Sequence, residues 1–143
     1  MKKMGLLAAL MLLVASAKAD ERLIEMKELP RAAQEFVMRH FGEAEVSAVW
    51  VDRDLLNNDY KVLFADGTSV EFDCQGAWVE VDADRGVVPE VLVPKQIRRS
   101  INERFGGREV RKIERDRRGY EVKLSNGLTL EYNQRFRLLE VDD

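Results

Sequence analysis

The side chains that most often perform catalysis or bind transition metals are scarce in this chain. His40 is its only histidine and Cys74 its only cysteine. A Cys-His pair that activates a nucleophile needs both residue types together, and a zinc site takes several such ligands. His40 falls near the end of a predicted helix, where an exposed polar residue is common. We therefore expect no catalytic residue and no enzyme, with Cys74 an unpaired thiol near a turn.

A group of oxygen-bearing side chains surrounds one predicted loop. Asp52, Asp54 and Asp59 lie close in sequence to Asn57 and Asn58, and hard oxygen ligands of this kind can bind calcium weakly. The spacing lacks the glycine and the terminal bidentate glutamate of an EF-hand loop. Asp and Asn are equally typical of solvated turns. We expect a solvated loop without metal or cofactor, and weak calcium binding stays open as the alternative.

The first 19 residues have the features of a secretory signal peptide. Lys2 and Lys3 precede an apolar run, and Ala17-Lys18-Ala19 has the small-x-small pattern of a cleavage site. The run is too short for a stable anchor, and no later stretch has the roughly 20 apolar residues that span a bilayer. We expect residues 1–19 to be a signal peptide and the mature chain to be periplasmic or secreted, without a membrane anchor.

The charge of the mature chain is acidic. Loss of the leader removes three lysines and no acid, so the formal net charge changes from −3 to −6. Arg108–Arg118 is rich in basic residues, but Glu109, Glu114 and Asp116 interleave with them. This pattern is typical of a solvated strand rather than of a stripe that follows phosphates. We expect no nucleic-acid binding.

Two stretches predict β-hairpins. Tyr60–Phe72 and Tyr120–Tyr132 each alternate apolar and polar residues on either side of Asp66-Gly67 or Asn126-Gly127. These dipeptides favour a type I′ turn, with positive φ at both central residues. The shared alternation predicts two inward faces. Their members are Tyr60, Val62, Phe64, Val70 and Phe72, and Tyr120, Val122, Leu124, Leu130 and Tyr132.

A helix is predicted ahead of each hairpin. Leu29-Pro30 and Val93-Pro94 each begin an amphipathic stretch that ends in Phe-Gly at the same distance from the proline. Further strands are predicted around the hairpins, over Val46–Asp52, Trp78–Asp82, Val110–Asp116 and Leu138–Asp142. This order predicts an α+β fold of two tandem repeats, each one helix followed by a four-stranded antiparallel sheet.

The same pattern predicts the boundaries of the chain's parts. Residues 20–28 form a linker, 29–83 the first repeat, 84–92 an extended connection, and 93–143 the second repeat. Each helix is expected to cover one face of its sheet and to leave the other face open.

The open faces of the two repeats differ in chemistry. Strand alternation places Trp50 and Trp78 outward in the first repeat, whereas the second repeat has Glu114 and Leu138 at the matching positions. Aromatic clusters rimmed by charge commonly mark binding sites. A segment folded over this face would be the alternative explanation. We expect a partner-binding site of four residues: Trp50, Leu63, Glu71 and Trp78.

These motifs together resemble a known family. Leu/Val-Pro, a helix ending in Phe-Gly, an Asp-Arg strand end, a Tyr-x-Val hairpin and a closing Val-Asp each occur twice. The combination resembles the PepSY-like family of exported bacterial proteins, described as β-lactamase-inhibitor-like, over Leu29–Asp143. The resemblance implies an inhibitor-like architecture in which paired sheets present a concave face to a protein.

The sequence thus predicts an exported, non-enzymatic protein-binding module, inhibitor-like in architecture. It would act through the open sheet face of the first repeat on a protein or peptide partner in the cell envelope. The alternative is a structural or sensing component of the envelope that binds peptides or associates with itself. An exposed apolar face favours the first function, and a self-pairing edge strand favours the second. The oligomeric state stays open.

Overall fold

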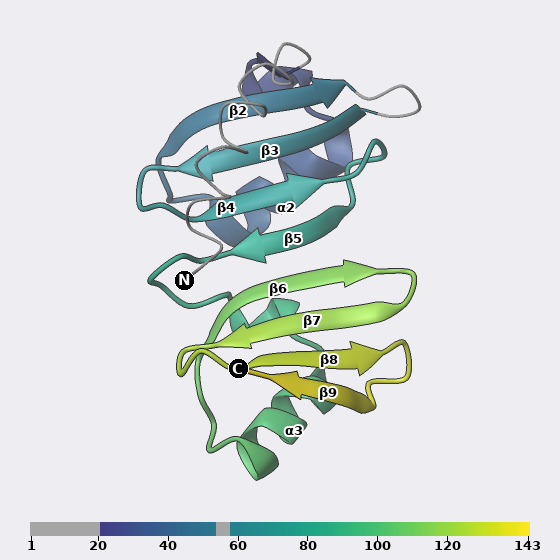
Figure 1. The fold of residues 1–143 in the computed structure, drawn as a ribbon. Helices are drawn as coiled ribbons and strands as arrows, with labels where there is room; N and C mark the ends of the chain where they lie inside the picture. The colour runs from purple at the N-terminus through teal and green to yellow at the C-terminus, as the bar shows by residue number, and fades with distance from the viewer. Residues whose placement is uncertain (1–20, 54–57) are drawn as a thin grey trace, which may run out of the picture.

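The computed structural model describes residues 21–53 and 58–143 (Figure 1). The predicted signal peptide lies outside the described residues. In chain order the elements are β1 (Glu21–Leu23), η2 (Met26–Glu28), α2 (Arg31–Phe41), β2 (Val46–Arg53), β3 (Asn58–Phe64), β4 (Ser69–Phe72), β5 (Trp78–Asp82), η3 (Glu90–Leu92), α3 (Lys95–Arg104), β6 (Val110–Asp116), β7 (Gly119–Leu124), β8 (Thr129–Asn133) and β9 (Leu138–Asp142).

All the strands of the described chain belong to one antiparallel sheet, ordered β1 to β9 as in the sequence. The prediction of two tandem repeats, each with its own four-stranded sheet, is therefore wrong. Strand β6 pairs directly with β5, and Val81 lies opposite Ile113. Both side chains are fully buried in a single core. Two separate sheets would leave this apolar surface exposed to water at their edges, so the pairing of β5 with β6 buries it.

The N-terminal edge of the sheet lies in the segment predicted as a linker. Glu21–Leu23 forms β1 and pairs with β2, so that Leu23 lies opposite Trp50. Residues 26–28 then make a short 3-10 helix before α2. The segment is thus an extra edge strand followed by one turn of helix.

Two helices pack on the same face of the sheet (Figure 1). Both begin directly after a proline, as predicted, and α2 ends before Gly42 and α3 before Phe105. Their buried stripes consist of Ala33 and Val37 in α2 and of Ile97 and Ile101 in α3. None of the helices in the described ranges is long and apolar enough to cross a membrane.

The two predicted hairpins form, with a turn type different from the prediction. Gly67 and Gly127 have φ of 95° and 92°, but the Asp66 and Asn126 before them do not have positive φ, so the turns are not type I′. Each glycine N–H instead donates to the carbonyl three residues earlier. The loop has one residue more than a two-residue type I′ loop before the two strands pair. This is the three-residue loop in which only the glycine is left-handed.

The hairpin residues predicted to face inward do face the helices. Val62, Phe64, Val70 and Phe72 are almost completely buried, and so are their counterparts in β7 and β8. Tyr60 and Tyr120 are half-buried and pack at the margin of the same core. The alternation of the hairpins therefore identified which face of the sheet the helices cover.

Candidate functional site

Three of the four predicted partner-binding residues lie on the sheet face opposite the helices. Trp50, Leu63 and Glu71 are each half-buried, and they alternate with the fully buried neighbours that face the core. Trp50 lies opposite Lys61 on β3, and Lys61 lies opposite Glu71 on β4. The structure thus brings these three side chains onto one face across adjacent strands.

Trp78 lies on the other face, contrary to the outward orientation predicted for it. Only 8% of its surface is exposed, and its ring centroid is 6.4 Å from that of Phe36 on α2. A β-bulge where β4 pairs with β5 inserts Val79 as an extra residue, which turns Trp78 inward. The Arg115 guanidinium lies 3.9 Å from the Trp78 ring centroid, and its Nε donates to the Trp78 carbonyl at 2.7 Å.

The most distinctive feature of the open face is a line of glutamates that runs across the strands. Beginning at β4, each strand contributes one glutamate directly opposite the next. We call this set the glutamate row; its members are Glu71, Glu80, Glu114, Glu121, Glu131 and Glu140. On the N-terminal side the same line continues through Lys61, Trp50 and Leu23.

Burial, together with repulsion within the glutamate row, raises the pKa of its central members. Burial, followed by the neighbouring charge of Glu71, raises the pKa of Glu80 to about 7. Burial, Glu114 and Glu131 likewise raise the pKa of Glu121. Like charges directly opposite each other destabilise a sheet. The row is therefore an arrangement that folding alone does not favour.

One lysine partly neutralises the centre of the row. The Lys112 ammonium lies 3.7 Å from a carboxylate oxygen of Glu80 and 3.3 Å from one of Glu114. Partial burial by itself would lower the pKa of Lys112, but the two carboxylates raise it. Two further lysines share this face, Lys61 opposite Glu71 and Lys123 opposite Lys112. Three lysines among six carboxylates leave the surface negative overall.

A shallow groove of about 320 Å³ follows the middle of the glutamate row. Every member of the row except Glu140 lines it. Val79 and Leu139, the extra residues of the bulges in β5 and β9, add apolar surface to the lining. The groove thus combines carboxylates with apolar side chains, as surfaces that bind peptide segments often do, and Arg115 and Arg118 lie at its margin.

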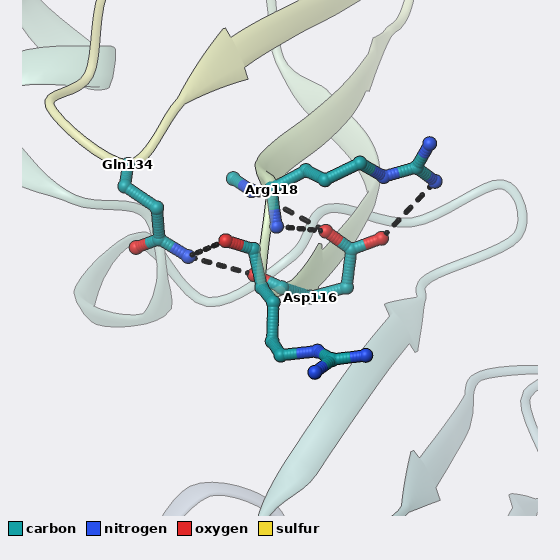
Figure 2. A network of polar contacts seen from close by, with 5 residues as sticks. Asp116, Arg118 and Gln134 are labelled. Atoms are coloured by element: carbon teal, nitrogen blue, oxygen red, sulfur yellow. Dashed lines mark hydrogen bonds and ion pairs between the residues drawn. The ribbon is translucent and has the colours of Figure 1, made fainter.

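The β6–β7 turn forms one rim of this groove and is held by a polar network (Figure 2). The Asp116 carboxylate accepts hydrogen bonds from the backbone N–H groups of Arg118 and Gly119 at 2.7 and 3.3 Å, which lowers the pKa of Asp116. The Gln134 side-chain amide donates to the carbonyls of Asp116 and Arg117 at 2.9 and 2.8 Å. A Cβ on Gly119 would lie 2.0 Å from the Tyr132 carbonyl oxygen, so glycine alone fits there.

Glu71 is the one member of the glutamate row that was predicted as a binding residue, while Glu114 was placed on the open face without a binding role. A signal was present, because β4, β5, β7, β8 and β9 each carry a glutamate between apolar residues, as in Val-Glu-Phe and Leu-Glu-Tyr. The pairing of β5 with β6 joins the two glutamates of the first half to the four of the second in one line. That pairing is distant in sequence and was not predicted.

The remaining candidate residues form no second site within the described part of the chain. Asp52 lies opposite Asp59 at the ends of β2 and β3, while Asp54 and Asn57 lie outside the described residues. Within residues 21–53 and 58–143 no three His, Cys, Asp or Glu side chains are arranged to hold a metal ion. Cys74 is exposed and unpaired.

The chain matches one protein-family model and several solved structures. Residues 58–140 match the family described as "Putative beta-lactamase-inhibitor-like, PepSY-like". A "putative calcium-regulated periplasmic protein" from Bacteroides thetaiotaomicron is 36% identical, with a TM-score of 0.84 over 87% of this chain and 98% of that one. A search of curated proteins found no match.

Two structures from Bacteroides vulgatus are similar to the same extent. One, a "putative periplasmic protein", is 34% identical with a TM-score of 0.84 over 87% of this chain and 98% of that chain. Another, described as of unknown function, is 33% identical with a TM-score of 0.81 over 86% and 99%. These neighbours confirm the predicted periplasmic location, and the family model confirms the predicted resemblance.

Proposed function

We propose, from the premise that this chain belongs to the PepSY-like, beta-lactamase-inhibitor-like family, that it is a periplasmic module that binds a protein partner. Its open sheet face would dock a segment of that partner rich in lysine or arginine. The inhibitor-like family and the periplasmic neighbours support a binding role. The expected chemistry of the partner comes from the charges on the sheet.

The glutamate row is the observation that carries this proposal. Adjacent strands lie about 4.8 Å apart, so six of them carry a line of carboxylates about 24 Å long. An extended segment of about seven residues has the same length. Lysine or arginine side chains along such a segment would each meet a carboxylate, and would offset the repulsion that the row creates in the free protein.

The opposite end of the same line supplies a different kind of contact. Trp50 and Leu63 are half-buried apolar side chains next to the acidic surface. An indole face attracts a lysine or arginine cation, and a partly buried aromatic ring often anchors a protein interface. A basic segment with an apolar residue at one end would therefore match both parts of the face.

The test uses heptalysine as the probe and isothermal titration calorimetry at low ionic strength. We expect binding that weakens steeply as salt is added, because the contacts are between exposed charges. The double variant Glu114→Gln/Glu121→Gln should bind about tenfold more weakly, since it removes two charged acceptors from the groove. Glutamine keeps the shape of the side chain, so the fold is retained.

The matched control removes two carboxylates elsewhere. Glu43→Gln/Glu45→Gln changes the net charge by the same amount in the exposed segment between α2 and β2. This variant should bind heptalysine within twofold of the unmodified protein. Equal losses in the two double variants would show that only overall charge matters and would contradict a docking face at the row.

A metal ion is the competing occupant of the acidic face. One structural neighbour is described as calcium-regulated, so the same titrations include calcium chloride with magnesium chloride as a comparison. We expect both salts to weaken heptalysine binding equally, by screening. Direct calcium binding that the Glu114→Gln/Glu121→Gln variant abolishes, with none for magnesium, would assign the row to a metal and overturn the proposal.

A further inference from the structure

The helix side of the sheet is filled differently in its two halves. In the N-terminal half, Phe36 of α2 contacts Phe72 and Trp78, with ring centroids 5.5 and 6.4 Å apart. The His40 ring lies 4.7 Å from Phe36 on the same helix. Four aromatic rings therefore close the space between α2 and strands β4 and β5.

The C-terminal half has small or charged residues at the corresponding positions. Counted from the prolines before the helices, Ser100 replaces Phe36 and Arg104 replaces His40. In the strands, the opposed pair Tyr132 and Leu138 replaces Phe72 and Trp78. The Tyr132 hydroxyl lies 2.9 Å from the Ser100 hydroxyl, so a polar contact takes the place of ring packing.

This exchange leaves an open groove of about 420 Å³ between α3 and the β8–β9 turn. We call it the arginine groove. The residues of its lining that matter here are Arg99, Ser100, Arg104, Phe136, Arg137 and Leu138. It lies on the helix side of the sheet, opposite the face that carries the glutamate row.

The turn that borders the arginine groove is strained at one residue. Phe136 has a φ of 64°, in the left-handed region that non-glycine residues rarely adopt. In the matching turn of the N-terminal half, Gly76 has a φ of 86°, and a Cβ there would lie 2.9 Å from the Pro30 Cβ. The first turn thus lies against its helix, whereas the second carries a phenyl group that lines the groove.

The charge of the groove favours an anion. Arg99, Arg104 and Arg137 all line it, and within the described part of the chain none of their guanidinium groups forms an ion pair or a hydrogen bond. Glu103 is the one carboxylate among the lining residues. Guanidinium groups bind phosphate and carboxylate oxygens through paired N–H donors.

We propose that the arginine groove binds a small, soluble phosphate monoester that carries an apolar or aromatic group. A phosphate monoester has a charge of about −1.5 to −2 at pH 7, which balances three arginines and one glutamate. Phe136 and Leu138 would contact the apolar group, while the Ser100 hydroxyl, which accepts a hydrogen bond from the buried Tyr132 hydroxyl, lies in the lining. The Phe136 ring also packs against Tyr120, with centroids 5.6 Å apart, and this contact holds the phenyl group at the groove.

The test is an NMR titration of the full mature chain with phenyl phosphate, with inorganic phosphate as the probe that lacks the ring. We expect shifts at Ser100, Phe136 and Arg137, and at least fivefold weaker binding of inorganic phosphate. Arg99→Gln/Arg137→Gln should weaken phenyl phosphate binding at least tenfold, because two charged donors are lost. The control Arg39→Gln, an exposed arginine on α2, should leave the affinity within twofold.

A second variant keeps all the arginines. Phe136→Gly removes the phenyl group and relieves the left-handed strain, so the fold should persist while phenyl phosphate binding drops to the level of inorganic phosphate. The proposal would be overturned if phenyl phosphate at millimolar concentration shifted the NMR signals of none of these residues. Binding to phosphatidic acid vesicles without binding of phenyl phosphate would likewise overturn the proposal that the ligand is a soluble ester. Glutamate-row variants should leave this titration unchanged, which separates it from the docking proposal.

Discussion

The two halves of the sheet have similar backbones but different side chains. On the helix side, the half with α2 and β2–β5 is closed by aromatic rings, whereas the half with α3 and β6–β9 has a polar groove. On the open side, β1–β3 present Leu23, Trp50 and Lys61, while the strands from β4 onward present glutamates. The comparison indicates that the first half contributes more packing and the second half more unpartnered charge, the usual arrangement of a scaffold that carries a binding surface.

The largest effect is expected from the core that both halves share. Phe64→Ala in β3 and Leu124→Ala in β7 each remove a side chain that is 1% exposed. Each should lower the free energy of unfolding by about 3 kcal/mol through loss of burial and creation of a cavity. Denaturant unfolding should show one transition for both variants, because one sheet joins the halves. Two separate transitions would show that the halves fold independently.

A surface substitution provides the control for this measurement. Lys123 projects from β7 on the exposed side of the same strand as Leu124. Lys123→Ala should change the free energy of unfolding by less than about 0.5 kcal/mol. If Lys123→Ala and Phe64→Ala were equally mild, the assignment of the inward face would be incorrect.

The next effect tests the aromatic filling of the first half. Phe36→Ser places in α2 the residue that α3 has at the matching position, and should cost about 2 kcal/mol because Phe36 is half-buried. Met38→Ser, on the exposed side of α2, should be nearly neutral in the same urea titration. A neutral Phe36→Ser would mean that ring packing does not distinguish the halves.

Local patterns predicted much of this fold. The prolines and glycines that bound α2 and α3, and the alternation in the hairpins, identified the helices and the inward face from a few neighbouring residues each. The pairing of β5 with β6 joins strands separated by a helix, and no local pattern encodes it. The continuous glutamate row depends on that pairing, and Glu71 was the only one of its six members predicted as a binding residue.

Small departures from ideal geometry account for the other differences. One extra residue at Val79 moves Trp78 from the predicted open face to the core, since a bulge reverses the alternation beyond it. One added loop residue likewise changes the turns at Gly67 and Gly127. The residues of the arginine groove show no pattern of alternation or spacing, because the groove arises where α3 lacks the aromatic side chains that α2 has.

The third effect concerns the pH dependence of stability. The pKa of Glu80 is raised to about 7 in the folded protein from an ordinary value of 4.5, so the folded state binds more protons between these values. The stabilisation that comes from this proton uptake by Glu80 is complete below about pH 4.5 and is lost as the pH rises through 7. Because Glu80 is only partly buried, solvent screening limits the loss to about 1 kcal/mol.

Thermal unfolding at several pH values measures this contribution. Glu80→Gln should flatten the decline between pH 4.5 and 7, whereas Glu43→Gln, outside the glutamate row, should keep it. An unchanged decline in Glu80→Gln would show that the charge of the row is relieved elsewhere, and would weaken the contrast between the acidic and apolar parts of the open face.

The smallest effect on stability is expected from Trp50, and it separates the two tryptophans most sharply. Trp50 is half-buried on the open face and lies beside Lys61, so Trp50→Ala should lower the free energy of unfolding by about 0.5 kcal/mol. It should weaken heptalysine binding about fivefold, because the indole no longer contacts a cation. Trp78→Ala should behave in the opposite way, since Trp78 packs on Phe36: it should cost about 3 kcal/mol and leave the affinity of the folded protein unchanged. Paired melts and titrations of the two variants test this directly. If Trp50→Ala were the more destabilising, a packed structure rather than a partner would explain its apolar surface, and the docking site would be confined to the glutamates.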